Sequence, residues 1–166
     1  MTITATISPC GRYRYTLTRD WTRGAGRMLW VMLNPSTADA SMDDPTIRRC
    51  VSFAQSWGFC GLTVVNLFAL RATDPRELAR VDDPIGPDNN EVIARAAHEH
   101  LFVCAGWGAH GSYLGRSAEV IDIITRRRSV IHCLGTTKSG EPRHPLYLPK
   151  RLAPIQLTRD TWEPKP

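Results

Sequence analysis

No apolar run in this sequence is long enough to cross a membrane. A membrane-spanning helix needs about 20 consecutive apolar residues, and every apolar run here is interrupted well before that length. The first fourteen residues also lack the apolar core of a secretory signal peptide. We therefore expect a cytoplasmic protein that does not bind membranes.

The common metal-binding and nucleotide-binding motifs are missing as well. The five cysteines are scattered, and no two have Cys-x-x-Cys spacing. A disulfide framework and a cysteine-ligated metal are therefore not expected. No Gly-Lys-Ser or Gly-Lys-Thr occurs, which excludes a Walker A loop. Asp43 and Asp44 suit a helix N-terminus without any cation, so we expect neither a metal nor another cofactor.

The composition is that of one soluble globular domain, which we expect to span residues 1–166 as a monomer. Hydrophobic residues make up 42% and charged residues 22% of the 166 residues. The net charge of +5 is compatible with a nucleic-acid partner, although many soluble proteins carry a similar charge. The one tight basic run, Arg126 to Arg128, follows an amphipathic helix, whose C-terminus favours cations in any case.

The hydrophobic pattern alternates between strands and helices and predicts an α/β fold. The first strand alternates polar and apolar residues, as an antiparallel edge strand does, whereas the later strands are short apolar runs separated by helices. Such an order implies a three-layer α/β/α sandwich with a mainly parallel central sheet. The expected strands are Arg12–Thr18, Met28–Leu33, Leu62–Asn66, Leu101–Ala105, Ser129–Cys133 and a short one at Pro154–Leu157. The expected helices run from Asp44 to Gly58, from Asn89 to His98 and from Ser112 to Thr125.

Polar residues follow the predicted strands at the edge where α/β proteins bind their ligands. Asn34 and Asn66 end two apolar strands, and His144 lies in a loop after the last strand of the sheet. An asparagine side chain offers a donor and an acceptor, which suits recognition of a base edge. Taken singly, Asn34 could be only a turn former and His144 only a surface residue. Because all three residues are expected on the same side of the predicted sheet, they are more consistent with a binding site than with three unrelated roles.

The segment from Gly106 to Gly111 matches the G-x-G-x-x-G fingerprint of dinucleotide-binding domains. It lies between a strand and a helix, as that fingerprint requires. However, no acidic residue follows the next strand after Cys133, and too little chain remains for the second half of such a domain. We therefore expect these glycines to serve a tight turn and close packing.

Several segments resemble the pattern of the DUF1643 family, an uncharacterised family of bacteria and phages. The resemblance extends from Tyr13 to Leu148 and implies no particular activity. It is carried by the segments MLNPSTADASMDDPTIRRC, TVVNLFALRATDP, IGPDNN, GWG and HPLYLP.

A more distant resemblance connects the chain to the uracil-DNA glycosylase superfamily, especially its mismatch-specific branch. Met32-Leu33-Asn34-Pro35-Ser36 is similar to the first motif of that family, with Met32 in place of a glycine. Asn66 follows an apolar strand, as the uracil-binding asparagine does, and His144-Pro145 matches the start of the last motif. The resemblance implies a uracil-DNA glycosylase-like domain. In it, Asn34 orients or activates the attacking water, and His144 hydrogen-bonds the leaving base.

The same resemblance implies the remaining site residues and the partner. The function expected is excision of a flipped uracil, mismatched base or modified base from double- or single-stranded DNA, in DNA repair or modified-base processing. Leu146, Tyr147 or Leu148 would wedge into the duplex. The base-binding residues would be Asn66, Phe68, Met42, Pro35 and Ser36. The residues expected to contact DNA are Arg71, Arg143, Tyr147, Leu148 and Lys150.

Two other functions fit the same pocket. The protein could be a non-catalytic module that binds nucleic acid or a nucleotide on the same fold. It could also be an enzyme that acts on a free nucleoside or nucleotide. Sequence alone leaves these alternatives open.

Overall fold

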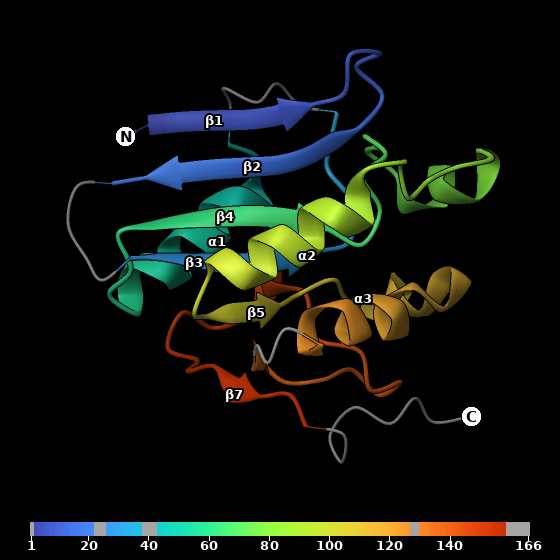
Figure 1. The fold of residues 1–166 in the computed structure, drawn as a ribbon. Coiled ribbons are helices and arrows are strands. Elements are labelled where there is room, and N and C mark those ends of the chain that lie inside the picture. Colours follow the sequence, from blue (N-terminus) through green and yellow to red (C-terminus); the bar gives the residue numbers. More distant parts are fainter. Residues whose placement is uncertain (1, 22–25, 38–42, 127–129, 159–166) are drawn as a thin grey trace.

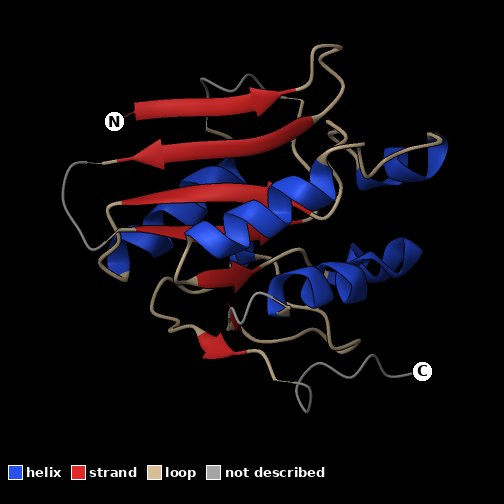
Figure 2. Cartoon of the chain, viewed as in Figure 1, coloured by secondary structure: helices blue, strands red, loops and turns tan. Residues whose placement is uncertain are grey.

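The computed structural model describes residues 2–21, 26–37, 43–126 and 130–158, which form an α/β fold around a seven-stranded sheet (Figures 1 and 2). The strands are β1 (Thr2–Ile7), β2 (Arg14–Asp20), β3 (Arg27–Met32), β4 (Gly61–Asn66), β5 (Val103–Ala105), β6 (Ile131–Cys133) and β7 (Ile155–Gln156). The α-helices are α1 (Pro45–Ser56), α2 (Asn89–Glu99) and α3 (Arg116–Thr125). Three short 3₁₀ segments are η1 (Pro75–Arg80), η2 (Ala109–Gly115) and η3 (Pro145–Tyr147).

The sheet is mixed, with a parallel centre and antiparallel edges. The strand order is β1-β2-β4-β3-β5-β6-β7. Strands β4, β3, β5 and β6 run parallel, whereas β1, β2 and β7 pair antiparallel with their neighbours. The sheet is therefore parallel only in its centre, and the antiparallel pairing expected for Arg12–Thr18 is confirmed for β2, although β1 forms the edge beyond it. The prediction missed β1 because its threonines and small residues lack the apolar content of a buried strand, and it lies on the exposed edge.

Two hydrophobic clusters cover the two faces of the sheet. Along β3 the side chains alternate, so that Leu29 packs with one cluster and Trp30 with the other. The first cluster includes the apolar residues of α2 and α3, and the second includes those of α1. Figure 1 shows α2 and α3 in front of the sheet and α1 behind it.

The ends of the helices follow the local chemistry of the sequence. The Asp44 carboxylate accepts the Ile47 main-chain N–H at 2.8 Å and Pro45 opens α1, which confirms the predicted N-cap. The predicted helix from Ser112 to Thr125 begins only at Arg116. Gly115 before it has a φ of 65°, and this left-handed residue separates η2 from the regular helix.

One irregularity in β2 changes which face its side chains reach. Thr6 pairs with Thr16 but Ile7 pairs with Arg14, so Tyr15 is an extra residue in the register with β1. This β-bulge puts Tyr15 in the cluster of α2 and α3, although Leu17, two residues on, packs in the cluster of α1. Arg14 consequently lies on the α1 side of the sheet.

Because β3 and β4 are parallel neighbours, their carboxyl ends lie side by side. Met32 is directly opposite Asn66 in this register. The segments that follow the two strands also hydrogen-bond, since Leu67 N donates to Met32 O and Phe68 N donates to Leu33 O. This edge of the sheet brings the polar residues after both strands together.

Within the described residues, no helix is both long enough and apolar enough to span a membrane.

Candidate functional site

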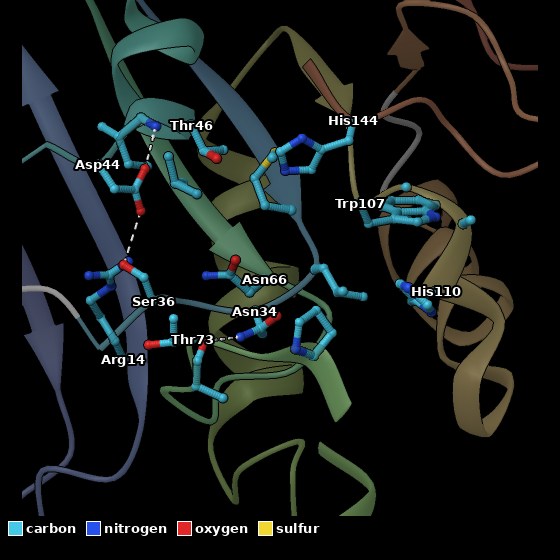
Figure 3. Close-up of a pocket in the computed structure, with 18 residues that line it drawn as sticks. Arg14, Asn34, Ser36, Asp44, Thr46, Asn66, Thr73, Trp107, His110 and His144 are labelled. Atoms are coloured by element: carbon cyan, nitrogen blue, oxygen red, sulfur yellow. Dashed lines mark hydrogen bonds between the residues drawn. The ribbon is translucent and has the colours of Figure 1, made fainter. Parts of the chain in front are cut away.

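A pocket of about 330 Å³ opens at the carboxyl ends of β3 and β4, on the α1 side of the sheet (Figure 3). Its size is at the lower end of the range for small-molecule sites. The walls come from β2, the strand ends, the start of α1, the glycine turn after β5 and the loop that begins η3. The polar residues among them are Arg14, Asn34, Ser36, Asp44, Thr46, Asn66, Thr73, His110 and His144.

Asn66 lies at the centre of this pocket. Its side chain is only 3% exposed, and in Figure 3 it stands between Asn34 and the ring of His144. No described residue hydrogen-bonds its side-chain amide. Two donors and one acceptor therefore remain open in a buried position, where an unpaired polar group is unfavourable without a ligand or water.

The side chain of Asn34 is held by its amide nitrogen. Its Nδ2 donates to the main-chain oxygen of Ala72 at 2.8 Å and to that of Pro35 at 3.1 Å. These two bonds fix the amide plane and use its donor. No residue in the described ranges donates to Oδ1. Asn34 therefore presents a fixed acceptor to the pocket.

His144 begins η3 and lies on the opposite side of the pocket. Its Nδ1 accepts the main-chain N–H of Leu146 at 3.3 Å, so the neutral ring carries its proton on Nε2. Burial lowers the pKa of His144, and the charge of Asp44 opposes that shift. The neutral imidazole with an Nε2–H donor is thus the form that suits the site near neutral pH.

Asp44 is the only carboxylate among the described residues that line the pocket. One of its oxygens caps α1, and the other accepts the Ser36 hydroxyl at 3.0 Å. A carboxylate has about four acceptor positions, so these two bonds leave capacity for a ligand or a water. The pocket therefore combines neutral amides and an imidazole with one negative charge.

Arg14 also lines the pocket, and the sequence did not indicate it. An alternating strand would place it on the same exposed face as Arg12, but the bulge at Tyr15 turns it inward. Its side chain is 5% exposed, and burial lowers its pKa. No local signal in RYRYTLT identifies Arg14, because the residues alternate regularly and the bulge appears only in the pairing with β1.

The glycine-rich turn after β5 has a structural role. The indole N–H of Trp107 donates to a carboxylate oxygen of Glu141 at 2.5 Å, and Glu141 also accepts the Ser117 hydroxyl at 3.0 Å. A side chain at Gly111 would collide with Trp107 and Glu141. These contacts agree with the expectation that the glycines serve packing, and Trp107 forms one wall of the pocket.

Two of the expected base-binding residues, Phe68 and Pro35, do not line this pocket. Met42 lies outside the described residues. Phe68 is fully buried in the cluster of α2 and α3, where it packs on Tyr113, because the chain turns away after Asn66. Pro35 is buried beside the pocket, and its main-chain oxygen binds Asn34 and Ala72 N. Ser36 does line the pocket, as does Met32, which narrows the pocket without filling it.

The residues expected to contact DNA fall into two groups. Arg143, Tyr147 and Lys150 are exposed, and Tyr147 is 91% exposed on η3 next to His144. Leu148 is 4% exposed and packs in the cluster of α1. Arg71 donates to the main-chain oxygens of Gly11 and Thr37 and so ties two loops together. Leu148 and Arg71 therefore have internal roles.

Metal-binding side chains do not gather at this site. In the part of the chain that the structure describes, no three His, Cys, Asp or Glu side chains are grouped as metal ligands would be. Cys50 and Cys104 are buried in the cluster of α1, and neither is among the residues that line the pocket.

The fold and the pocket define an α/β protein with a polar ligand site at the carboxyl edge of a mixed sheet. The family model of DUF1643, described as a protein of unknown function, matches residues 14–146. The chain therefore belongs to the DUF1643 family. Comparison with curated proteins found no match, and comparison with solved structures found none either.

Proposed function

We propose that the pocket binds a nucleobase extruded from DNA and that the protein hydrolyses the bond between this base and its sugar. The observation that carries the proposal is the set of three neutral groups in one pocket. Asn66 offers an unpaired buried amide, Asn34 a fixed acceptor and His144 an Nε2–H donor. Such groups suit the edge of a base, which presents amide-like donors and acceptors.

In the proposed reaction, Asn66 binds the edge of the base and His144 donates to a base carbonyl oxygen. A water molecule attacks C1′ of the sugar, and the bond from C1′ to the base nitrogen breaks. Its electron pair leaves with the base, where the His144 donor stabilises the developing negative charge. Asn34 Oδ1 accepts a hydrogen bond from the attacking water, and Asp44 takes up the proton that the water loses.

The proposal extends to the fold, the partner and the surroundings of the pocket. We propose the three-layer α/β/α arrangement of the uracil-DNA glycosylase superfamily, supported by α1 on one face of the sheet and α2 and α3 on the other. Exposed Arg143, Tyr147 and Lys150 beside the pocket would contact DNA, with Tyr147 as the side chain that enters the stack. The protein would act as a cytoplasmic monomer in DNA repair or modified-base processing.

The test measures abasic sites in labelled double- and single-stranded oligonucleotides that contain uracil, a mismatched thymine or a modified base. Base release is expected from at least one substrate, with a loss of about 10²- to 10³-fold in His144→Ala. Asn66→Ala is expected to abolish base selectivity. Asn90→Ala is the matched control, because Asn90 is an exposed asparagine on α2 outside this pocket.

Absence of base release from the whole panel, together with unchanged binding in Asn66→Ala, would contradict the proposal. Binding that depends on Asn66 without release would instead identify a binding module. DNA binding by that module would weaken with salt, because phosphate contacts release counterions.

A further inference from the structure

Arg14 is a buried cation in the pocket without a hydrogen-bonding partner. None of its three guanidinium nitrogens donates to a described residue, and Nε is completely shielded from solvent without a partner. No carboxylate of the described residues lies within ion-pair distance of it. An unpaired buried charge strongly destabilises a folded protein. The presence of Arg14 at this position therefore needs a functional explanation.

The other two buried arginines among the described residues each have a carboxylate as ion-pair partner. Arg19 is 0% exposed, and its Nε binds a carboxylate oxygen of Asp43 at 2.7 Å. Arg116 is also 0% exposed, its Nε donates to Leu67 O at 2.6 Å, and its Nη1 lies 2.8 Å from a carboxylate oxygen of Glu119, although Nη1 and Nη2 have no hydrogen-bond partner. Arg14 differs from both, because it lines the pocket and has no carboxylate of the described residues within ion-pair distance.

The charged groups around Arg14 leave a net positive charge on this side of the pocket. Asp44 attracts it across the pocket, while Arg19 and Arg71 repel it. Arg19 is already paired with Asp43, and the two oxygens of Asp44 already accept Ile47 N and the Ser36 hydroxyl. A guanidinium remains protonated even when burial lowers its pKa.

The surroundings also supply hydroxyl groups. Thr46 and Thr73 line the same pocket, and Thr46 lies in the first turn of the twelve-residue helix α1, where the helix dipole favours an anion. Figure 3 shows Arg14 and Ser36 close together on the side of the pocket opposite His144. The β-bulge at Tyr15 is what directs Arg14 to this position.

We propose that Arg14 forms an anion subsite of this pocket and that the ligand carries a phosphate or carboxylate oxyanion there. The inference rests on the proposed function for the rest of the pocket, since Asn66 and His144 would hold the base while Arg14 holds the charged group. The oxyanion has two sources: the phosphate of a free mononucleotide, or an acidic substituent on a base in DNA. A bidentate contact from a guanidinium suits either oxyanion.

The experiment uses the whole chain and measures binding of uracil, deoxyuridine, deoxyuridine monophosphate and inorganic phosphate by calorimetry at constant ionic strength. A single-stranded oligonucleotide with one 5-carboxycytosine and its cytosine counterpart form the second arm. Arg14→Gln is compared with the wild type and with Arg27→Gln, an exposed arginine on β3 away from the pocket.

We expect an anionic ligand to bind about 10- to 100-fold more tightly than its uncharged counterpart, and this preference to vanish in Arg14→Gln only. A preference for the monophosphate over deoxyuridine identifies a free nucleotide, and a preference for the 5-carboxycytosine strand identifies an acidic base. Without ligand, Arg14→Gln is expected to melt at the same temperature as the wild type or higher, because it removes an unpaired buried charge. This readout also shows that the variant folds.

Equal affinities for charged and uncharged ligands in the wild type would overturn the anion subsite. An anion preference that Arg14→Gln retains would overturn it as well. If uracil and deoxyuridine bind in an Asn66-dependent way but Arg14 has no effect, the anion subsite fails and the base site stands. If inorganic phosphate binds through Arg14 but no base or nucleoside binds, the anion subsite stands and the proposed function fails.

Discussion

The side chain of Asn89 holds the backbone of Asn66 in place. Its Nδ2 donates to the main-chain oxygens of Asn66 and Leu67 at 3.0 and 3.1 Å, and Asn89 is completely buried. The first turn of α2 thereby fixes the end of β4 from the face opposite the pocket. The orientation of the central pocket amide depends on a residue that does not line the pocket.

Asn89→Ala is therefore expected to destabilise the protein by about 2–3 kcal/mol, because a buried main-chain oxygen loses its side-chain donor. Urea denaturation measures this change in the free energy of unfolding. Asn90→Ala, at the exposed neighbouring asparagine, is the control and is expected to change it by less than about 0.5 kcal/mol. Equal effects of the two substitutions would show that Asn89 does not fix β4.

Two arginine–aspartate pairs, Arg19–Asp43 and Arg27–Asp20, should differ sharply in their contribution to stability. Arg19→Ala leaves the carboxylate of Asp43 without its buried partner and is expected to cost about 3–5 kcal/mol. Arg27→Ala breaks a pair with Asp20 in which the arginine is half exposed, and is expected to cost less than about 1 kcal/mol. Thermal and urea unfolding measure both. A similar cost for both pairs would contradict the assigned burial.

The pKa of His144 sets a pH dependence of stability. Burial lowers this pKa in the folded protein below its value of about 6.5 in the unfolded chain. Above about pH 6.5 the ring is neutral in both the folded and the unfolded state, so His144 contributes no pH dependence of stability there. As the pH falls through 6.5 the unfolded chain takes up a proton first, and stability decreases until the lower pKa of the folded state is passed.

His144→Asn is expected to remove this loss of stability between pH 6.5 and the lower folded pKa, as measured by urea denaturation at a series of pH values. NMR titration of the ring would give its folded pKa directly. A folded pKa above 6.5 would reverse the sign of the dependence and contradict the assignment. His98→Asn, at an exposed histidine on α2, is the control.

Asp44 can be tested without disturbing the helix that it caps. Asparagine is as good an N-cap as aspartate, so Asp44→Asn should change stability by less than about 1 kcal/mol. If Asp44 accepts the proton of the attacking water, the same variant should lose base release by at least about 10²-fold. Release that persists at the wild-type rate would leave Asp44 with only its structural role.

The cysteines should react in an order set by exposure. Cys10 is exposed, and its contact with the Ser8 hydroxyl lowers the pKa of its thiol. Burial raises the pKa of the thiols of Cys50 and Cys104. Iodoacetamide should therefore label Cys10 in the folded protein, and Cys50 and Cys104 only after unfolding. Peptide mass spectrometry measures this order, and labelling of Cys104 in the native state would contradict its burial.

The parts of the fold that the sequence predicted are those governed by local chemistry. The apolar runs that stop at Asn34 and Asn66 correctly indicated two buried strands, and Asp44-Pro45 correctly indicated the start of α1. Parallel pairing then brings the two strand ends together, so the position of this part of the pocket followed from the pattern.

The parts that the sequence did not predict depend on tertiary register. Regular alternation in β2 would leave Arg14 outside, and only pairing with β1 reveals the extra residue. Phe68 was expected to bind the base, as the resemblance to the glycosylase superfamily implied, but the hydrogen bond from its N–H to Leu33 O turns it into the core. No local pattern distinguishes these outcomes, because both depend on segments distant in sequence.

The extra residue in β2 also has a consequence for how this pocket can diversify. If β2 kept its present length but paired with β1 without the bulge, Tyr15 would lie on the same face as Leu17, and Arg14 would turn to the opposite face. A relative with such regular pairing would offer an aromatic surface in place of the guanidinium and would prefer uncharged or cationic compounds. The ligand class of such proteins could therefore change through the pairing of one strand, with the scaffold unaltered.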